Sequence, residues 1–589
     1  MGWKEKMDQA RGLATIDLVL RNAQLVNVFS GEIHQTDIGI QQGKFVGIGE
    51  FPDARRIVNL DGRYVVPGLI DGHVHIESSQ LCPPEFCSLL LSHGVTTAVV
   101  DPHEIANVAG EAGIRYILES VDQLPFNTFV VLPSCVPATT LETSGAHLDA
   151  QKLAGFVGHP KVLGLGEVMD YPAVLTAQPE MVAKLELPLP FKDGHAPGIH
   201  PQDLNAYFWA GMHTDHECSI PEEVRERLRR GFYVMLREGS AAKNLLALLP
   251  AVSNYNARQF LFVTDDRHPT DLWHEGSIDH LVRLAIKAGQ PPVRVIQMAT
   301  INTAMALGLS GLGAVAPGYQ ADFVVLSNLE NFIIEEVYWR GSKQSASGSR
   351  PAFPIRRVKH LEQSIRLGDW NAEKLAVKKP PKSELREVKG SKTTGEESPE
   401  SVAVRVMGVQ GHSLVTTVLW RNLPVKAGMV MPDPTRGIAK LVVVERHHGS
   451  GGTGVAFVQG LGLIKGAVAS TVAHDSHNLI VAGMSDAEIA LAIRTCELMG
   501  GGLCLVEGDR VLGKLPLPIA GLMSDQPAEI VAATLGELHR MAKSLGISSE
   551  VDPFMTLAFL SLPVIPELKL TDCGLVDVER QVLVGLFNN

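Results

Sequence analysis

The spacing of hydrophobic residues changes along the chain and divides it into regions. Between residues 16 and 66, short β-rich runs such as G-K-F-V-G-I-G alternate with turns, which predicts a small antiparallel sheet. From Pro67 onward, apolar strand-like runs alternate with helical stretches at intervals of roughly 25 to 45 residues, as βα units require. The pattern is β-rich again from Leu312 to Leu326, so we expect the chain to return there and complete the first sheet.

The middle region predicts a (β/α)8 barrel, because it contains eight apolar runs with helical stretches between them. These runs lie near Leu69, Thr97, Val130, Leu163, Leu189, Gly211, Val234 and Phe262. The fold class is therefore α/β: a barrel over residues 68–310, with a small flanking β-sandwich domain built from residues 1–67 and 311–373.

The last third of the chain predicts an additional domain. Residues 374–401 are rich in Lys, Glu, Pro, Ser and Gly, which is typical of a linker. Beyond them, strands such as K-L-V-V-V-E and a helix over Asp486 to Met499, capped by Ser485, predict a C-terminal α+β domain over residues 402–589.

Composition narrows the class of protein. The net charge is -12 over 589 residues with no basic stripe, which argues against nucleic acid as a partner. No apolar run reaches membrane-spanning length, and the polar start from Met1 to Arg11 lacks the apolar core of a signal peptide. The seven cysteines are irregularly spaced and include no C-x-x-C pair, which indicates free thiols. We expect a cytoplasmic enzyme that binds neither nucleic acid nor membrane.

The segment V-V-P-G-L-I-D-G-H-V-H carries the strongest chemical signal. His73 and His75 follow an apolar strand and are two residues apart, so their side chains point the same way. Two neighbouring imidazoles can bind one divalent metal ion. The alternative is a pair of solvated loop histidines.

Other strand ends supply further metal ligands, because functional residues of such barrels lie at the C-terminal ends of the strands. Strand four ends at Glu167, strand five at His195, strand six at His216, and strand eight at Asp265 or Asp266. Four imidazoles, a carboxylate able to bridge and a terminal aspartate can hold two metal ions, which lower the pKa of a hydroxide between them.

Strand six offers a second histidine near its end. His213 lies close to His216 in the sequence. A capping box formed by Ser219 and Glu222 favours His216, because it places His216 at the turn from strand to helix.

The ordered ligand series resembles the amidohydrolase superfamily. The motifs P-G-L-I-D-G-H-V-H-I-E-S-S, D-P-H-E-I-A-N-V, G-E-V-M, D-G-H-A-P-G, T-D-H-E and A-H-D-S-H-N narrow the resemblance to the adenine deaminase family over nearly the whole chain. Related hydantoinase-like enzymes usually bridge their metals with a carboxylated lysine. Glu167 takes that place here, as in the adenine deaminases.

This resemblance implies hydrolysis of adenine to hypoxanthine and ammonia with two divalent metal ions. Manganese or iron is favoured over zinc as the bound metal. Asp265 would then be a catalytic residue as well as a ligand, exchanging protons with the nucleophile and the departing nitrogen. Glu217 is a second catalytic candidate near a ring nitrogen, as is the D-P-H-E cluster of Asp101, His103 and Glu104. The alternative for D-P-H-E is a loop that caps a helix. Ser134, Glu142 and Ser144 could contact the base.

The cluster His474, Asp475 and His477 has three interpretations: a second metal site, a lid or substrate contact, or a polar turn. We expect the segment from Thr471 to Asn478 to approach the barrel mouth, with His477 or His474 near the bound base.

A cyclic amidase acting on hydantoin-like rings and a non-catalytic scaffold are the rival functions. The partner classes expected are a small-molecule substrate and a second copy in a homodimer.

Overall fold

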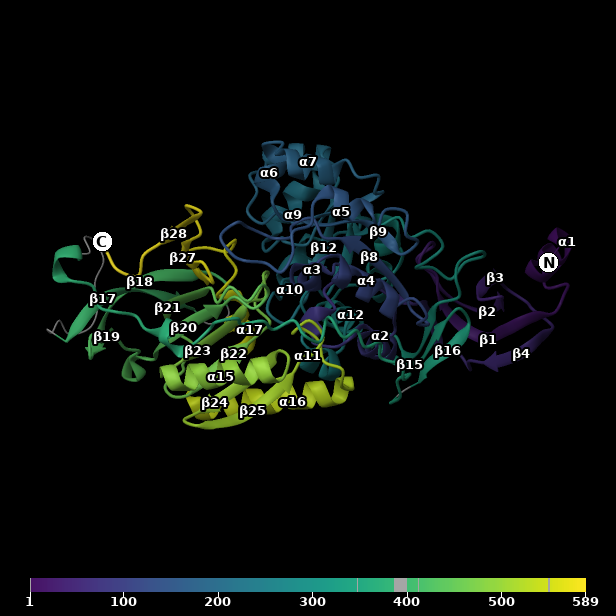
Figure 1. Cartoon of the computed structure of the whole chain (residues 1–589). Coiled ribbons are helices and arrows are strands. Elements are labelled where there is room, and N and C mark those ends of the chain that lie inside the picture. The colour runs from purple at the N-terminus through teal and green to yellow at the C-terminus, as the bar shows by residue number, and fades with distance from the viewer. Residues whose placement is uncertain (1, 347, 386–399, 411–412, 549–550, 589) are drawn as a thin grey trace.

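The computed structural model describes residues 2–346, 348–385, 400–410, 413–548 and 551–588. Figure 1 shows three bodies in a row: a small sheet carrying the N-terminus at one end, the barrel in the middle, and the C-terminal domain at the other end. Within the described residues, no helix is both long and apolar enough to cross a membrane.

The small domain is one curled sheet of eight described strands in the order β16-β15-β14-β5-β1-β2-β3, with β4 on β1. Phe323 pairs antiparallel with Pro67, which confirms that the chain returns to this sheet after the barrel. Both ends of the sheet contribute to a shared core that includes Leu20, Phe45 and Tyr338. The elements are α1 (Trp3–Ala10), β1 (Ile16–Val26), β2 (Ile33–Gln41), β3 (Lys44–Ile48), β4 (Ala54–Asn59), β5 (Tyr64–Pro67), β14 (Phe323–Asn328), β15 (Ile333–Trp339) and β16 (Ser342–Ala346).

The expectation of a purely antiparallel sheet was wrong. β4 and β5 both pair parallel to β1. The β2–β3 hairpin occupies one edge of β1, so the following strands add to its other edge and run in the same direction as β1.

All eight expected barrel strands form near their predicted positions and run parallel. They are β6 (Leu69–Val74), β7 (Val95–Val100), β8 (Asn127–Leu132), β9 (Val162–Val168), β10 (Phe191–Gly194), β11 (Thr214–Asp215), β12 (Tyr233–Arg237) and β13 (Phe260–Val263). At one seam the amide of Asp265 donates to His73 O at 3.1 Å, and at the other the amide of Gly194 donates to Thr214 Oγ1 at 3.3 Å. These contacts close the barrel and bring the strand ends together.

Helices surround the barrel, most of them between consecutive strands (Figure 1). They are α2 (Pro83–Ser92), α3 (His103–Ala109), α4 (Glu111–Ser120), α5 (Ala150–Ala154), α6 (Tyr171–Leu175), α7 (Pro179–Leu185), α8 (Asp203–Trp209), α9 (Pro221–Leu228), α10 (Leu245–Leu248), α11 (Pro269–His274), α12 (Ile278–Lys287), α13 (Pro292–Met298) and α14 (Ile301–Ala306). The predicted capping residue of α9 was off by one. Pro221 begins the helix, so Glu223 and not Glu222 accepts from the amides of Ser219 and Ile220.

Part of the expected linker packs against the C-terminal domain. Leu375 is buried with Trp370 and Val444, and Val377 is also buried. The region 386–399 lies outside the described residues, so the linker prediction is open there.

The C-terminal domain contains a nine-stranded sheet among its described residues, in the order β19-β18-β17-β21-β20-β23-β22-β24-β25, and a small sheet of β26, β27 and β28. Ser485 caps α15 through the Glu488 amide, as predicted. The elements are β17 (Ser401–Val409), β18 (Thr416–Lys426), β19 (Met429–Val430), β20 (Ile438–Val444), β21 (Thr453–Gln459), β22 (Ala467–Ser470), β23 (Leu479–Gly483), α15 (Asp486–Leu498), β24 (Gly502–Glu507), β25 (Arg510–Pro516), α16 (Ala528–Ala542), α17 (Pro553–Phe559), β26 (Leu568–Thr571), β27 (Gly574–Asp577) and β28 (Val582–Val584).

Alternate residues of β20 belong to different cores, as strand geometry requires. Val442 and Val444 join the core under α15, while Leu441 and Val443 join the core that continues through α16 into the barrel. One face of the large sheet is therefore directed toward the barrel.

Candidate metal centre and active site

His73 and His75 lie at the end of β6 with both Nε2 atoms directed to one point. His73 Nδ1 donates to Asp193 Oδ2 at 2.7 Å, and His75 Nδ1 donates to the main-chain oxygen of Asp101 at 2.9 Å. In the neutral ring that ligates a metal ion, these bonds place the proton on Nδ1 and leave the lone pair of each Nε2 to the metal. The two Nε2 atoms lie 3.2 Å apart.

Glu167, at the end of β9, lies between two pairs of histidines. Its Oε1 is 3.2 Å from His73 Nε2 and 2.9 Å from His75 Nε2. Its Oε2 is 2.6 Å from His195 Nδ1 and 3.5 Å from His216 Nε2. One carboxylate therefore offers a separate oxygen to each pair, which is the arrangement of a bridging ligand.

Strand eight directs Asp265 and not Asp266 toward this point. Asp265 Oδ1 lies 3.1 Å from His75 Nε2 and 3.7 Å from His73 Nε2. Asp266 instead accepts a hydrogen bond from Ser78. At strand six, His216 is buried and faces Glu167, while His213 is exposed beside Phe208. The structure thus brings together all six residues expected as ligands.

The donor set fits divalent metal ions. The buried atoms Glu167 Oε1 and His216 Nδ1 have no hydrogen-bond partner among the described residues. Burial lowers the pKa of His73, yet hydrogen bonds and charge from Asp193 and Glu167 hold it well above its ordinary value, so the centre attracts positive charge. Imidazole and carboxylate ligands suit zinc, iron and manganese alike.

Arg237 and Glu217 flank the centre on the side of β12. Arg237 Nη1 lies 2.8 Å from Asp265 Oδ2 and also pairs with Glu217. Burial raises the pKa of Glu217, but the charge of Arg237 outweighs it and holds that pKa below its ordinary value. Glu217 Oε1 is 3.8 Å from His195 Nδ1, so this carboxylate faces the second histidine pair.

The D-P-H-E segment does not cap a helix through Asp101, because Asp101 Oδ2 accepts from the amide of Glu167 at 2.9 Å. His103 Nδ1 lies 3.6 Å from Glu167 Oε1, and burial lowers the pKa of His103 to about 3. Glu104 accepts from Ser78 Oγ at 2.9 Å and faces the C-terminal domain. Ser134, expected to contact the base, donates its hydroxyl to the main-chain oxygen of Glu167.

The sequence interpretation missed Asp193 and Arg237. The sequence does contain a pattern that could have identified Asp193. The motif D-G-H occurs twice, at Asp71 and at Asp193, each time at the end of a barrel strand. Arg237 is the last residue of β12, the strand end to which no candidate was assigned.

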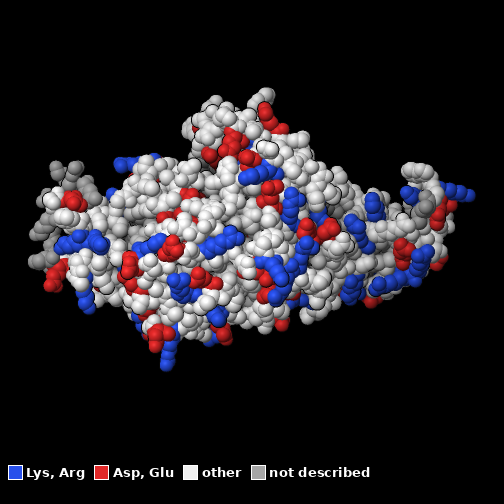
Figure 2. Space-filling model, viewed as in Figure 1, with Lys and Arg blue, Asp and Glu red and all other residues white. Residues whose placement is uncertain are grey.

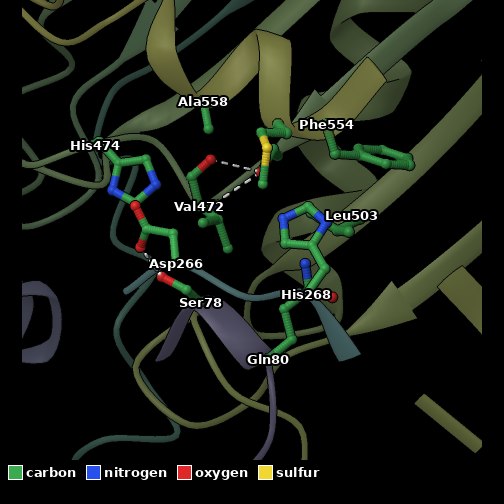
Figure 3. Close-up of a pocket in the computed structure, with 11 residues that line it drawn as sticks. Ser78, Gln80, Asp266, His268, Val472, His474, Leu503, Phe554 and Ala558 are labelled. Atoms are coloured by element: carbon green, nitrogen blue, oxygen red, sulfur yellow. Dashed lines mark hydrogen bonds between the residues drawn. The ribbon is translucent and has the colours of Figure 1, made fainter. Parts of the chain in front are cut away.

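The segment from Thr471 to Asn478 lies at the barrel mouth, as expected. His474 Nδ1 is 3.4 Å from Glu104 Oε1, and its ring stacks on Phe559 with centroids 4.6 Å apart. Figure 3 shows His474 beside Asp266 on one side of a small cavity and Phe554 on the other. This cavity has a volume of about 20 Å³, room for about one water molecule, so the C-terminal domain packs closely here.

Comparison with known proteins decides the family. The amidohydrolase family matches residues 64–343, and the adenine deaminase C-terminal domain matches residues 413–582. The chain is 51% identical over 578 residues to adenine deaminase 2 of Carboxydothermus hydrogenoformans, with 98% of each chain covered. The chain belongs to the adenine deaminase family.

Other adenine deaminases agree with this assignment. That of Desulfatibacillum aliphaticivorans is 44% identical over 581 residues, with 98% of each chain covered. Among solved structures, the β-aspartyl dipeptidase of Fervidobacterium islandicum AW-1 shows a TM-score of 0.44 and 18% identity over 58% of this chain and 99% of its own. As a member of the adenine deaminase family, the chain is a metal-dependent aminohydrolase.

Proposed function

We propose that the centre at the barrel mouth hydrolyses adenine to hypoxanthine and ammonia. The ligands of two divalent ions would be His73, His75, Glu167, His195, His216 and Asp265. The observation that carries this proposal is the position of Glu167, whose two oxygens lie 2.9 Å from His75 Nε2 and 2.6 Å from His195 Nδ1. A bound divalent ion supplies a lowered pKa for water and so a nucleophile near neutral pH.

Asp265 moves the protons in this proposal. It accepts a proton from the attacking water and delivers it to the amine nitrogen that leaves the ring. Burial raises its pKa, but hydrogen bonding to His75 and the charge of Arg237 hold that pKa well below its ordinary value. Asp265 is therefore ionised and ready to accept.

Glu217 stabilises the altered ring. Its ionised carboxylate passes the other proton of the attacking water to the ring nitrogen beside the reacting carbon as that carbon becomes tetrahedral, and then accepts a hydrogen bond from the new ring N–H. His103, Glu104 and His477 form the wall against which the base lies. Asp101 and Ser134, which we had expected to touch the base, hold the main chain of Glu167 and are better described as positioning residues.

The test compares substrates on metal-loaded protein. Enzyme loaded with manganese or iron should release ammonia and form hypoxanthine from adenine, and should bind about two ions per chain. Glu167→Ala should lose most metal and activity. Ring opening of hydantoin or dihydropyrimidine without adenine turnover would favour the cyclic amidase, and a metal-free, inactive protein would favour the scaffold.

We also propose that the native metal is manganese or iron and that the chain forms a homodimer. The domain boundaries and a cytoplasmic location are likewise proposals. A reducing compartment agrees with the seven free cysteines, six of them buried. On the face shown in Figure 2, Lys and Arg are interspersed with Asp and Glu, which agrees with a small-molecule substrate.

A further inference from the structure

The ring of His477 is held in one tautomer by its own turn. The amide of Ala473 donates to His477 Nδ1 at 3.1 Å, and the amide of His477 donates back to Ala473 O at 2.7 Å. Because Nδ1 accepts a hydrogen bond, the single proton of the neutral ring lies on Nε2. Burial, together with the charges of His474 and Arg446, lowers the pKa of His477 well below its ordinary value, so the ring is neutral.

The resulting Nε2–H is buried without an acceptor. His477 is 0% exposed, and its Nε2 has no hydrogen-bond partner among the described residues. Buried N–H groups are nearly always paired, because an unpaired one loses its bond to water without compensation. An unpaired donor at an active-site mouth therefore indicates a group that accepts when a ligand is bound.

His477 lies close to the residues that surround the proposed metal centre. One of its ring nitrogens lies within 4.8 Å of ligand atoms of Glu104 and His474, and Glu104 in turn lies within 4.8 Å of His75 and His103. Glu104 is thus a neighbour of both His75 and His477, so a flat bicyclic base whose reacting carbon is at the metals can reach His477 with its far edge. A metal ion at His477 is disfavoured, because Nδ1 accepts from the Ala473 amide and Nε2 carries the proton of the neutral ring.

A buried arginine fixes the turn that presents this N–H. Arg446 donates from Nε to His477 O and from Nη2 to Ala520 O at 3.0 Å. It also donates from Nη1 to Ser364 Oγ at 3.1 Å. A Cβ at position 521 would approach Arg446 Nη1 to 2.8 Å, so Gly521 leaves room for the guanidinium.

We propose that His477 Nε2–H donates to an unprotonated ring nitrogen of the purine, on the side remote from the reacting carbon. His477 thereby becomes a specificity-determining residue supplied by the C-terminal domain. This inference rests on the proposed function, because it takes adenine as the base.

The test removes either end of the hydrogen bond. Adenine is compared with 3-deazaadenine and 7-deazaadenine, in which one ring nitrogen is replaced by C–H, on the wild type, His477→Phe and His477→Asn. We expect wild-type kcat/KM to fall by roughly tenfold to a hundredfold for 3-deazaadenine, which lacks a nitrogen on the side remote from the reacting carbon, and much less for 7-deazaadenine, whose missing nitrogen lies on the same side as that carbon. His477→Phe should lose a similar factor on adenine and no longer distinguish the two bases. His477→Asn, which keeps an N–H and suits the positive φ of 55°, should recover part of the preference.

Two controls make the outcome decisive. Metal content and melting temperature should match the wild type, and inhibition constants of hypoxanthine and its deaza analogues should show the same pattern without turnover. Equal losses on all three bases in an active series would overturn the donor role. Loss of a bound metal ion in His477→Phe would show that His477 is a ligand instead. A metal-loaded wild type that does not deaminate adenine would overturn the proposed function itself.

Discussion

The proton positions of His73 and His75, two of the proposed metal ligands, are set by the groups that bind their Nδ1 atoms. Asp193 accepts from His73 Nδ1 at 2.7 Å and from Thr214 Oγ1 at 2.7 Å. A carboxylate behind an imidazole fixes its tautomer, orients the ring and raises its basicity toward a metal. Asp193 thus acts on the proposed centre through His73.

Replacing Asp193 tests this at the level of one residue. Asp193→Ala should weaken metal binding by about tenfold to a hundredfold, because His73 loses the group that orients it. Titration with Mn²⁺, followed by metal analysis after gel filtration, measures the effect. Asp203→Ala, at an exposed position of α8, is the matched control and should bind metal normally. Unchanged affinity in Asp193→Ala would contradict the orienting role.

Single residues also show what the sequence could and could not predict. His73, His75, Glu167, His195, His216 and Asp265 follow from strand alternation and barrel geometry, because strand ends must converge. The orientation of the Asp101 and Ser134 side chains could not be predicted from the sequence pattern. Both side chains bind the main chain of Glu167, which is distant in sequence. The choice between Glu222 and Glu223 depended on a helix start, which pattern alone places only within a residue or two.

At the scale of elements, β26 supports the helix that backs His474. Lys569 of β26 donates from Nζ to Phe559 O at 3.0 Å, at the end of α17, and to Leu414 O at 2.9 Å. Phe559 is the residue on which the His474 ring stacks. Burial lowers the pKa of Lys569 from 10.5 to about 7.

This depressed pKa predicts a pH dependence of stability. Between pH 7 and 10.5 the unfolded chain binds the proton and the folded chain does not, so the contribution of Lys569 to the unfolding free energy rises with pH. Its slope is at most about 1.4 kcal/mol per pH unit. Lys569→Met should lose this rise, and melting temperatures of both proteins from pH 6.5 to 9.5 measure it. Parallel curves would show that Lys569 titrates normally.

At the scale of the whole molecule, the proposed active site lies at the contact between the barrel and the C-terminal domain. Asp572 Oδ1 accepts from the amide of Thr143 at 2.9 Å and from Asn478 Nδ2 at 3.2 Å. Asn478 Nδ2 also donates to Thr143 O at 2.8 Å. The loop after β8 is thereby joined to the turn that carries His477.

The sequence predicted the three regions and the approach of the His474 segment, but not this contact. Thr143 and Asp572 are separated by 429 residues, and no periodicity or motif relates them. The parallel pairing of β4 and β5 was missed for a similar reason, because strand order depends on which edge stays free and not on the alternation within each strand.

Asp572→Ala should therefore act on catalysis from outside the metal shell. Its loss leaves the Thr143 amide and Asn478 without their shared acceptor, at a cost of about 1 to 3 kcal/mol. The turn of His477 is then less well fixed, so kcat/KM for adenine should fall by roughly tenfold, because a small misplacement of positioning groups is costly. Metal content should stay at the wild-type level. Asp577→Ala, in the neighbouring strand β27 and bonded locally to the Arg580 amide, is the matched control and should keep full activity. Wild-type turnover of adenine by Asp572→Ala would show that the two domains do not cooperate through this contact, and a fall in its metal content would show that the contact acts on the metal shell itself.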